Sequence, residues 1–261
     1  MIRIRDMELG SGIPKICVPV VETTPEAIRA AARRVRDSAA DLLEWRADYL
    51  EGAAEPGRIV PVLSEIRGEI GRMPLLFTFR SGPEGGAARE ELTAEEYLRL
   101  NRAVTGSGQA DLVDVELRWG ETMMRTLVRE AHDAGQRIVA SSHDFRKTPS
   151  AKEMSACFLQ MEDWGADILK QAVMPQDTED VLRLLGVCRK TALCTERPVV
   201  AISMGRAGLE SRICAEAFGS ALTFGCLGKA SAPGQINVEE LSQILKILHR
   251  CRGGQERESQ R

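Results

Sequence analysis

The sequence lacks the features of a secreted or membrane-anchored protein. No apolar run reaches about 18 residues, the length that a membrane-spanning helix requires. The N-terminal stretch "MIRIRDMELGSGIPKICVPV" lacks the long apolar core and the small-residue cleavage site of a signal peptide. None of the seven cysteines forms a CxxC pair, and most lie in apolar patterns, which favours free buried thiols over a disulfide framework. We therefore expect a protein of the reducing cytoplasm.

Two further absences restrict the partners. The formal net charge is only −3 at pH 7 and the basic residues are scattered, so neither nucleic acid nor an anionic membrane is an expected partner. Histidine is scarce, and two of the three residues, His132 and His249, lie in helical patterns. A single further histidine does not supply the several ligands that a metal needs. We expect no metal and no cofactor, and a small-molecule substrate held by a local cluster of charge.

The chain does contain a strongly repeated pattern. Apolar residues make up 43% and charged residues 28%, which is typical of a soluble globular protein with a sizeable core. Short β-rich apolar runs alternate with helical patterns, several of which begin at a Ser or Thr cap and end near Gly. The eight runs are "KICVPV" (15–20), "DLLEWR" (41–46), "LLFTFR" (75–80), "LVDVEL" (112–117), "IVASSH" (138–143), "DILKQA" (167–172), "VVAISM" (199–204) and "ALTFG" (221–225).

Eight strand-then-helix units predict an α/β protein, a (β/α)8 TIM barrel that forms a single domain over residues 1–261. A doubly wound open sheet is the alternative. The helical pattern at 237–251 completes the outer ring. Residues 1–14 precede the first strand and are expected to cover the bottom of the barrel, and residues 252–261 form a polar C-terminal tail.

Polar residues occur late in the predicted strands. Side chains alternate across a strand, and in "DLLEWR" the apolar Leu43 and Trp45 suit the side that faces the helices, so the charged residues of this run point inward. The same reasoning turns inward Glu44, Arg46, Thr78, Arg80, Asp114, Glu116, Ser141, His143 and Lys170. A barrel interior needs branched apolar residues, whereas the mouth at the C-terminal ends of the strands is where such enzymes keep their chemistry. The pattern predicts an active site there.

A purely structural role is the alternative for some of these residues. Glu44 with Arg46, or Asp114 with Arg80, could form a buried ion-pair network that fixes the barrel. For Lys170, the functional reading is a free amine that attacks a ketone or aldehyde to form a Schiff base. The simpler reading of this lysine is a point charge that binds an anionic substrate.

His143 and a region after the seventh strand complete the predicted site. Imidazole changes charge near neutral pH, so His143 is a candidate general base and acid. Arg212 lies where such barrels often bind anions, and its planar fork can hold a carboxylate by two hydrogen bonds. The following loop indicates a lid, although ordinary turn geometry also explains its glycines. The loop contains Gly228, Ser231, Pro233, Gly234 and Gln235.

These residue types suit a small anionic ketone that carries hydroxyl groups, and a proton abstraction next to the imine. The residues alone leave open whether the next step is loss of water, as in a dehydratase, or cleavage of a carbon-carbon bond, as in a class I aldolase. A catalytically inactive barrel that serves as a binding module is a third possibility.

Seven motifs carry a resemblance to a known family. They are "EWRADYL" (44–50), "TFRSGPEGG" (78–86), "DVEL" (114–117), "SSHDF" (141–145), "DILKQAVMP" (167–175), "SMGRAGLESR" (203–212) and "FGCLGKASAPGQI" (224–236). Together, and in this order, they closely resemble the type I 3-dehydroquinate dehydratases of the shikimate pathway. The resemblance extends from about residue 15 to residue 250.

The resemblance implies a hydro-lyase with three catalytic residues. Lys170 matches the lysine that forms the Schiff base with the C3 ketone of 3-dehydroquinate. His143 matches the residue that takes a C2 proton and returns one to the departing C1 hydroxyl in a syn elimination, and Glu84 matches the acid that orients it. The resemblance implies that Arg212 binds the substrate carboxylate, with Ser231 and Gln235 from the lid. It implies that Glu44, Arg46 and Arg80 hold the ring hydroxyls of the substrate. Met204 and Phe224 match the apolar wall of the pocket.

The resemblance also implies a homodimer, and a reaction that serves either the biosynthesis of aromatic amino acids or the breakdown of quinate. The chain departs from the family pattern at Arg118, where an aromatic residue is common, and in "GCLGKA" just before the lid. Both departures lie outside the catalytic positions. They leave the fine adjustment of the site to its substrate open, but not the reaction.

Overall fold

Eight parallel strands form the central barrel of the computed structural model, which describes residues 1–52, 55–88, 91–228 and 231–253. The strands pair in chain order, and the last of them, β10, pairs in parallel with the first, β3. The strands are β3 (Lys15–Val20), β4 (Leu42–Arg46), β5 (Leu75–Thr78), β6 (Leu112–Glu116), β7 (Arg137–Asp144), β8 (Ile168–Val173), β9 (Val199–Ser203) and β10 (Leu222–Cys226). The predicted (β/α)8 barrel is confirmed, and the open-sheet alternative is wrong because the sheet returns to its first strand.

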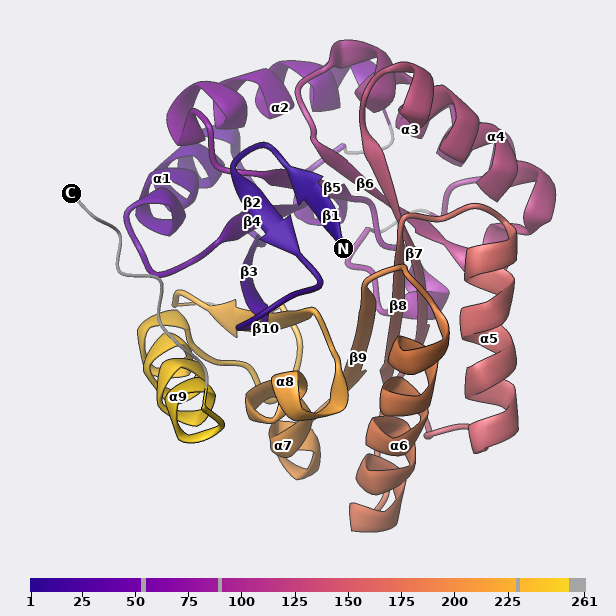
Figure 1. The fold of residues 1–261 in the computed structure, drawn as a ribbon. Helices are drawn as coiled ribbons and strands as arrows, with labels where there is room; N and C mark the ends of the chain where they lie inside the picture. Colours follow the sequence, from indigo (N-terminus) through magenta and orange to yellow (C-terminus); the bar gives the residue numbers. More distant parts are fainter. Residues whose placement is uncertain (53–54, 89–90, 229–230, 254–261) are drawn as a thin grey trace.

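Helices surround the strands as an outer ring (Figure 1). They are α1 (Pro25–Arg36), α2 (Pro56–Ile70), α3 (Ala94–Ser107), α4 (Glu121–Asp133), α5 (Ala151–Asp163), α6 (Thr178–Cys194), α7 (Leu209–Ile213), α8 (Ala215–Phe218) and α9 (Val238–Cys251). Local sequence fixes where several begin: Thr93 and Ser150 each form a capping box with the glutamate three residues later. No helix among the described residues is long and apolar enough to cross a membrane.

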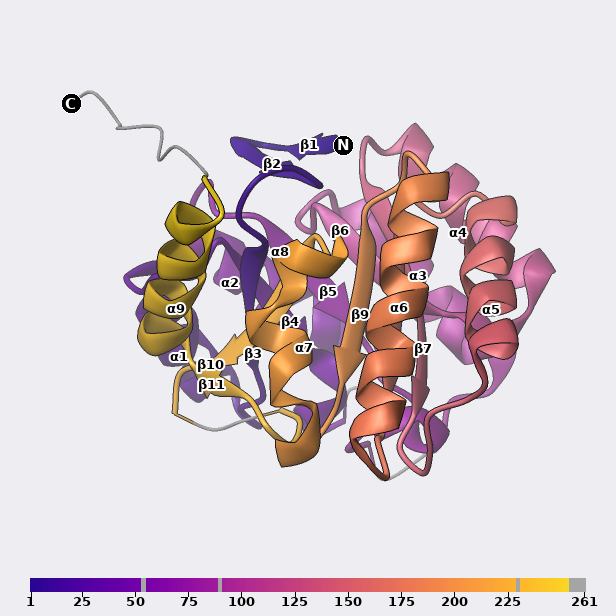
Figure 2. The ribbon, with the colours of Figure 1, turned by 60° about the horizontal axis from the view of Figure 1, so that its bottom comes forward.

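A two-stranded hairpin lies across one end of the barrel (Figure 2). It consists of β1 (Ile2–Ile4) and β2 (Met7–Leu9). Its apolar side chains pack on inward-facing residues at the start of the strands, such as Leu42 and Leu76. At the other terminus α9 ends at Cys251, and residues 254–261 of the predicted polar tail lie outside the described residues.

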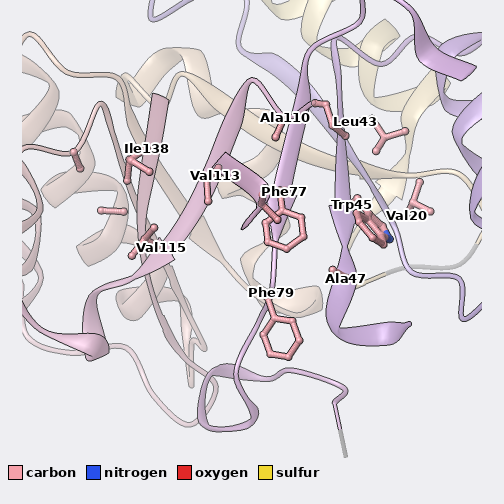
Figure 3. Close-up of a cluster of buried hydrophobic side chains, with 14 of the residues drawn as sticks. Val20, Leu43, Trp45, Ala47, Phe77, Phe79, Ala110, Val113, Val115 and Ile138 are labelled. Carbon is pink, nitrogen blue, oxygen red and sulfur yellow. The ribbon is translucent and has the colours of Figure 1, made fainter. Parts of the chain in front are cut away.

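The main core fills the layer between the strands and the helices. Trp45 and Phe77 are fully buried there and meet edge to face, with ring centroids 5.8 Å apart (Figure 3). Leu43 and Phe79 belong to the same cluster, so the predicted inward and outward faces of these strands are confirmed. Burial of each such side chain contributes about 1.5–3 kcal/mol. The outward-facing core thereby frees the inner face for polar groups.

The barrel closes through a seam with little strand pairing. Among the described residues a single bridge crosses this seam, from Val199 at the beginning of β9 to Ser220, two residues before β10, and serine side chains accept from other backbone amides of β9. Ser220 Oγ accepts from Ala201 N at 3.2 Å, and Ser211 Oγ accepts from Ser203 N at 2.9 Å. Because α7 packs against both strands, this seam places its Arg212 beside the barrel interior.

A short addition to the sheet follows the predicted lid. Strand β11 (Ile236–Asn237) pairs in parallel with β10, with Gly225 opposite Ile236. The loop between these two strands therefore starts and ends at the same edge of the barrel, over the C-terminal ends of β9 and β10. Asn237 then caps α9 by accepting from Glu239 N at 2.9 Å.

Candidate active site

A cavity with an empty volume of about 500 Å³ lies at the C-terminal ends of the strands. All eleven predicted site residues line it: Glu44, Arg46, Arg80, Glu84, His143, Lys170, Met204, Arg212, Phe224, Ser231 and Gln235. Sequence reasoning missed five further residues of its wall, which are Gly85, Phe145, Ala172, Ile202 and Ala232. The polar residues late in the strands thus converge on one concave site.

Lys170 projects into this cavity from the middle of β8. Its side chain is only 6% exposed, and its Nζ lies 3.5 Å from Asp114 Oδ2. Nζ also lies over the Phe224 ring, 4.8 Å from its centroid. Lysine is rarely buried to this degree without a functional reason. A buried amine with access to a cavity can act as a nucleophile toward a carbonyl group.

His143 and Glu84 form a buried pair beside this lysine. Nδ1 of His143 lies 2.8 Å from Glu84 Oε2, and both side chains are 8% exposed. Glu84 ends the short helix Gly82–Glu84, after which Gly85 turns the chain with φ of 85°. Glycine suits this left-handed conformation, and a Cβ there would also meet the Phe145 ring at 2.4 Å.

The surroundings displace the pKa values of this pair in opposite directions. Burial, together with the Glu116 and Asp114 carboxylates, raises the pKa of Glu84 to about 8, although Arg80 opposes this. Burial lowers the pKa of His143 well below its usual value, and the cations Arg80 and Lys170 lower it further. At neutral pH the imidazole is therefore uncharged, and the proton of the pair is carried by the carboxyl group. Displaced values of this kind are typical of general acid and base groups.

Arg80 connects the carboxylates beneath the cavity. Its Nη2 donates to Asp114 Oδ1 at 2.9 Å, and its Nη1 donates to Glu116 Oε1 and Ser141 Oγ, each at 2.9 Å. The side chain is 3% exposed. The ion-pair network considered for Asp114 and Arg80 is therefore present, and it lies under the catalytic candidates instead of apart from them.

Glu44 and Arg46 do not pair with each other in the described structure. Glu44 accepts from Thr78 Oγ1 at 2.8 Å, whereas Arg46 donates from Nε and Nη2 to the two oxygens of Asp48, each at 2.8 Å. Asp48 also accepts from Ala87 N at 2.9 Å. This aspartate, which sequence reasoning missed, thereby fixes the arginine and the loop that carries Glu84. Its only sequence signal is the two-residue spacing in "RAD".

Arg212 is buried without a carboxylate partner among the described residues. The residue is 1% exposed, Nη1 donates to the Phe224 carbonyl at 3.4 Å and Nη2 to the Pro233 carbonyl at 3.1 Å. Nε has no hydrogen-bond partner within the part of the chain that the structure describes. Burial lowers the pKa of this guanidinium to about 10. A buried cation with carbonyl partners alone is suited to bind an anion in the cavity.

The predicted lid lies against this arginine. Gln235 Oε1 accepts from Ser231 N at 2.9 Å, and Gln235 Nε2 donates to Ser231 Oγ at 3.0 Å. The Pro233 carbonyl also accepts from Gly205 N at 3.1 Å, which holds the loop over β9. Gly228 is described and exposed, while residues 229–230 of the loop lie outside the described residues. The described part of the loop thus places one amide side chain, that of Gln235, and one hydroxyl side chain, that of Ser231, at the cavity edge.

Phe145, the other clear omission, lies over His143. The two rings are stacked with centroids 6.5 Å apart and an interplanar angle of 22°. Although Phe145 is 37% exposed, its loop is fixed: Asp144 Oδ1 accepts from Arg146 N at 2.8 Å, and the Arg146 carbonyl accepts from Gln176 Nε2 at 2.8 Å. An aromatic residue two positions after a candidate base, in "SSHDF", was a signal that could have identified it.

The carboxylates of the cavity bind arginine, lysine, histidine and hydroxyl groups. Within residues 1–52, 55–88, 91–228 and 231–253, no group of three or more His, Cys, Asp or Glu residues is arranged to hold a metal ion.

Comparison with known proteins gives a consistent result. Residues 16–252 match the family model of the type I 3-dehydroquinases. A 3-dehydroquinate dehydratase of Bacillus licheniformis is 43% identical over 251 residues, which covers 96% of this chain and 98% of the relative. The protein of the same name from Klebsiella pneumoniae is 42% identical and covers 95% of this chain and 98% of its own.

Solved structures agree with the sequence comparison. The crystal structure of a type I 3-dehydroquinate dehydratase from Clostridium difficile, with covalent modified comenic acid, superposes with a TM-score of 0.92 at 39% identity. The match covers 96% of this chain and 98% of that one. A 3-dehydroquinate dehydratase from Geobacillus kaustophilus gives the same TM-score at 36% identity, over 95% of this chain and 96% of that one.

Proposed function

The chain belongs to the type I 3-dehydroquinase family, and we propose that it is the hydro-lyase that converts 3-dehydroquinate to 3-dehydroshikimate through a Schiff base on Lys170. One observation carries this proposal: a buried lysine, an imidazole paired with a carboxyl group, and an arginine without a carboxylate partner among the described residues open onto the same cavity. The C. difficile relative is described with a covalent modified comenic acid, which supports a nucleophile in this kind of site.

The first chemical step joins Lys170 to the substrate. The neutral amine attacks the C3 ketone, and the oxygen leaves as water, with one proton from the nitrogen and one from solvent, to give an iminium ion. The positive nitrogen then withdraws electrons from the neighbouring C2–H bond. In this way the buried lysine replaces a cofactor as the electron sink.

His143 then transfers the protons of the elimination. The ring nitrogen that is not bound to Glu84 takes a proton from C2, and the electrons of that bond move to the iminium to form an enamine. The enamine expels the C1 hydroxyl, which leaves as water with the proton from His143. Hydrolysis of the remaining imine consumes the water released at the first step and frees the product, so the net change is the loss of one water.

The binding groups are proposed from the same geometry. Arg212 holds the substrate carboxylate, because its guanidinium is buried with only carbonyl partners. Ser231 and Gln235 add hydrogen bonds from the lid. The ring hydroxyls face the remaining polar lining, and the apolar wall excludes water from the imine. The polar residues that face the hydroxyls are Glu44, Arg46 and Arg80, and the apolar wall consists of Met204 and Phe224.

Borohydride trapping tests the proposed function directly. The protein is incubated with 3-dehydroquinate and borohydride, and the added mass is located by peptide mapping. We expect the reduced adduct on Lys170, its loss in Lys170→Ala, and its retention in Lys190→Met, a control at an exposed lysine on α6. A folded protein without adduct would contradict the Schiff base, and a carbon-carbon cleavage product in the same reaction would favour a class I aldolase.

We further propose that the enzyme acts as a homodimer in the reducing cytoplasm. All seven cysteines are free, and burial raises the pKa of the Cys188 thiol to about 12, so this thiol stays protonated and unreactive. Free thiols of this kind are compatible with a reducing compartment. Size-exclusion chromatography with light scattering would show the mass of two chains if the dimer exists, and the mass of one chain would contradict it.

A further inference from the structure

One oxygen of the buried Asp114 carboxylate is not used by the ion-pair network. Oδ1 accepts from Arg80 Nη2 at 2.9 Å and from Ser141 Oγ at 2.6 Å. Oδ2 has no hydrogen-bond partner in the described part of the chain and lies 3.5 Å from Lys170 Nζ. An interior carboxylate oxygen without a hydrogen bond destabilises the fold. A structural pair with Arg80 would therefore not account for the position of Oδ2.

Two neighbours of the Lys170 nitrogen favour a positive charge. The Asp114 carboxylate lies 3.5 Å from Nζ, and Nζ lies over the face of the Phe224 ring, 4.8 Å from its centroid. Burial alone would raise the pKa of Asp114, but Arg80 and Lys170 lower it below its usual value, so the group is an anion at neutral pH. With both oxygens buried, no solvent layer screens its charge from the lysine.

In the proposed reaction this nitrogen becomes a cation when the iminium group forms. We propose that Asp114 is the counter-ion of the Schiff base, whose Oδ2 stabilises the iminium form on Lys170 and so favours proton removal at C2. The inference rests on the proposed function. Asp114 forms no bond in this role and gains no proton: the nitrogen attacks as a neutral amine, gives one of its two hydrogens to the departing C3 oxygen, and keeps the other as the iminium N–H that faces the carboxylate.

The test combines substitution with borohydride trapping of 3-dehydroquinate. Asp114→Asn keeps the shape of the side chain and removes its charge. We expect the fraction of chains reduced at Lys170 after a short exposure to fall about tenfold or more, the scale of losing one buried charge partner. KM should change less than about threefold because the binding groups remain. Asp114→Glu, which keeps the charge, should recover part of the lost adduct.

Asp167→Asn is the matched control. It makes the same replacement at a buried aspartate, which is 4% exposed and lies at the opposite end of the barrel. Its adduct should stay within about twofold of that of the unsubstituted protein. Equal trapping in the unsubstituted protein and in Asp114→Asn would overturn the counter-ion role alone. Absence of adduct from the unsubstituted protein would instead overturn the proposed function.

A second measurement covers the case in which Asp114→Asn does not fold. His143→Ala should accumulate the imine, whose C=N stretch can be recorded by Raman spectroscopy in H₂O and in D₂O. A band that shifts to lower frequency in D₂O is expected for an iminium whose N–H is held by a carboxylate. A band that does not respond to D₂O would identify a neutral imine and overturn the proposal.

Discussion

The two ends of the barrel contain the same type of residue in different surroundings. Just before every second strand of the barrel, a polar side chain accepts a hydrogen bond from a backbone N–H of the preceding strand. The pairs are Asp41 with Ile16 N at 2.7 Å, Asp111 with Leu75 N at 2.9 Å, Asp167 with Ile138 N at 2.9 Å and Ser220 with Ala201 N at 3.2 Å. At the C-terminal ends, three carboxylates share one cation: Arg80 pairs with Glu84, Asp114 and Glu116.

This difference separates a structural from a chemical use of carboxylates. Each carboxylate at the N-terminal ends of the strands has a fixed backbone amide partner, and two strands separate it from the next carboxylate of this kind. The C-terminal carboxylates lie close enough that Glu116 and Asp114 raise the pKa of Glu84, while Arg80 and Lys170 lower the pKa of Asp114. Like charges placed together around few cations give groups that readily gain or lose a proton. Substitutions at the two ends should therefore affect different measurements.

The largest expected effect is on turnover at the C-terminal end. Lys170→Ala removes the amine that we propose forms the imine, so kcat should fall by at least about 10⁴-fold, the scale of losing a covalent nucleophile. The barrel should remain folded, since the site lies outside the main apolar core. Circular dichroism and a steady-state assay of product formation measure the two quantities. Near-normal kcat in the folded variant would eliminate the Schiff-base role.

His143→Ala should have the next largest effect. The lysine is unchanged, so the imine should still form and be trapped by borohydride. Proton transfer at C2 loses its base, and kcat should fall about 10²- to 10⁴-fold. Mass spectrometry of the trapped adduct and single-turnover kinetics distinguish the two steps. Loss of the adduct together with turnover would show that the histidine also serves imine formation.

Local sequence patterns were sufficient for the fold and for most of the site. Strand and helix periodicity located all eight barrel strands to within about two residues, since barrel strands are short apolar runs between capped helices. Alternation then assigned the inward face, which brought Lys170, Arg80 and the carboxylates to one mouth. The hairpin at residues 2–9 and the β9–β10 seam were not expected, because they depend on contacts between segments distant in the sequence.

The omissions at the site have a common physical cause. Asp48 and Phe145 follow the strands, where alternation no longer applies and the direction of a side chain depends on loop geometry. The pairing of Arg46 with Asp48, and not with Glu44, likewise depends on the short helix Ala47–Tyr49 that turns the aspartate back. Charge and spacing can propose an ion pair, but they do not choose between two carboxylates at similar separation.

At the N-terminal end, Asp167→Ala should change stability and leave turnover unchanged. The substitution leaves the buried Ile138 N–H without its acceptor and removes the carboxylate 2.8 Å from His132 Nε2. A loss of about 1–3 kcal/mol in the free energy of unfolding is expected. Urea denaturation measures it, with Asp37→Ala on the exposed surface as a control that should change little. A large fall in kcat would contradict the division between the two ends.

The smallest effect concerns the pH at which the C-terminal pair becomes a base. Below pH 8 Glu84 keeps its proton and donates it to Nδ1 of His143, so the other ring nitrogen carries the hydrogen and cannot accept one. Above this pH the carboxylate accepts from Nδ1–H, and the other nitrogen is free to take the C2 proton. The raised pKa keeps Glu84 protonated, and His143 therefore inactive as a base, up to about pH 8. We expect kcat/KM to rise as the pH passes through this value.

Glu84→Gln tests this assignment, because an amide has no proton to lose in that range. The rise in kcat/KM near pH 8 should disappear, while the value at pH 7 should change by no more than about tenfold, since the base itself remains. Glu121→Gln, on the exposed surface of α4, is the matched control and should keep the rise. If the rise persists in Glu84→Gln, the group that titrates near pH 8 is not Glu84. The proton would then be shared among the other carboxylates of the C-terminal end, and not held within the His143–Glu84 pair alone.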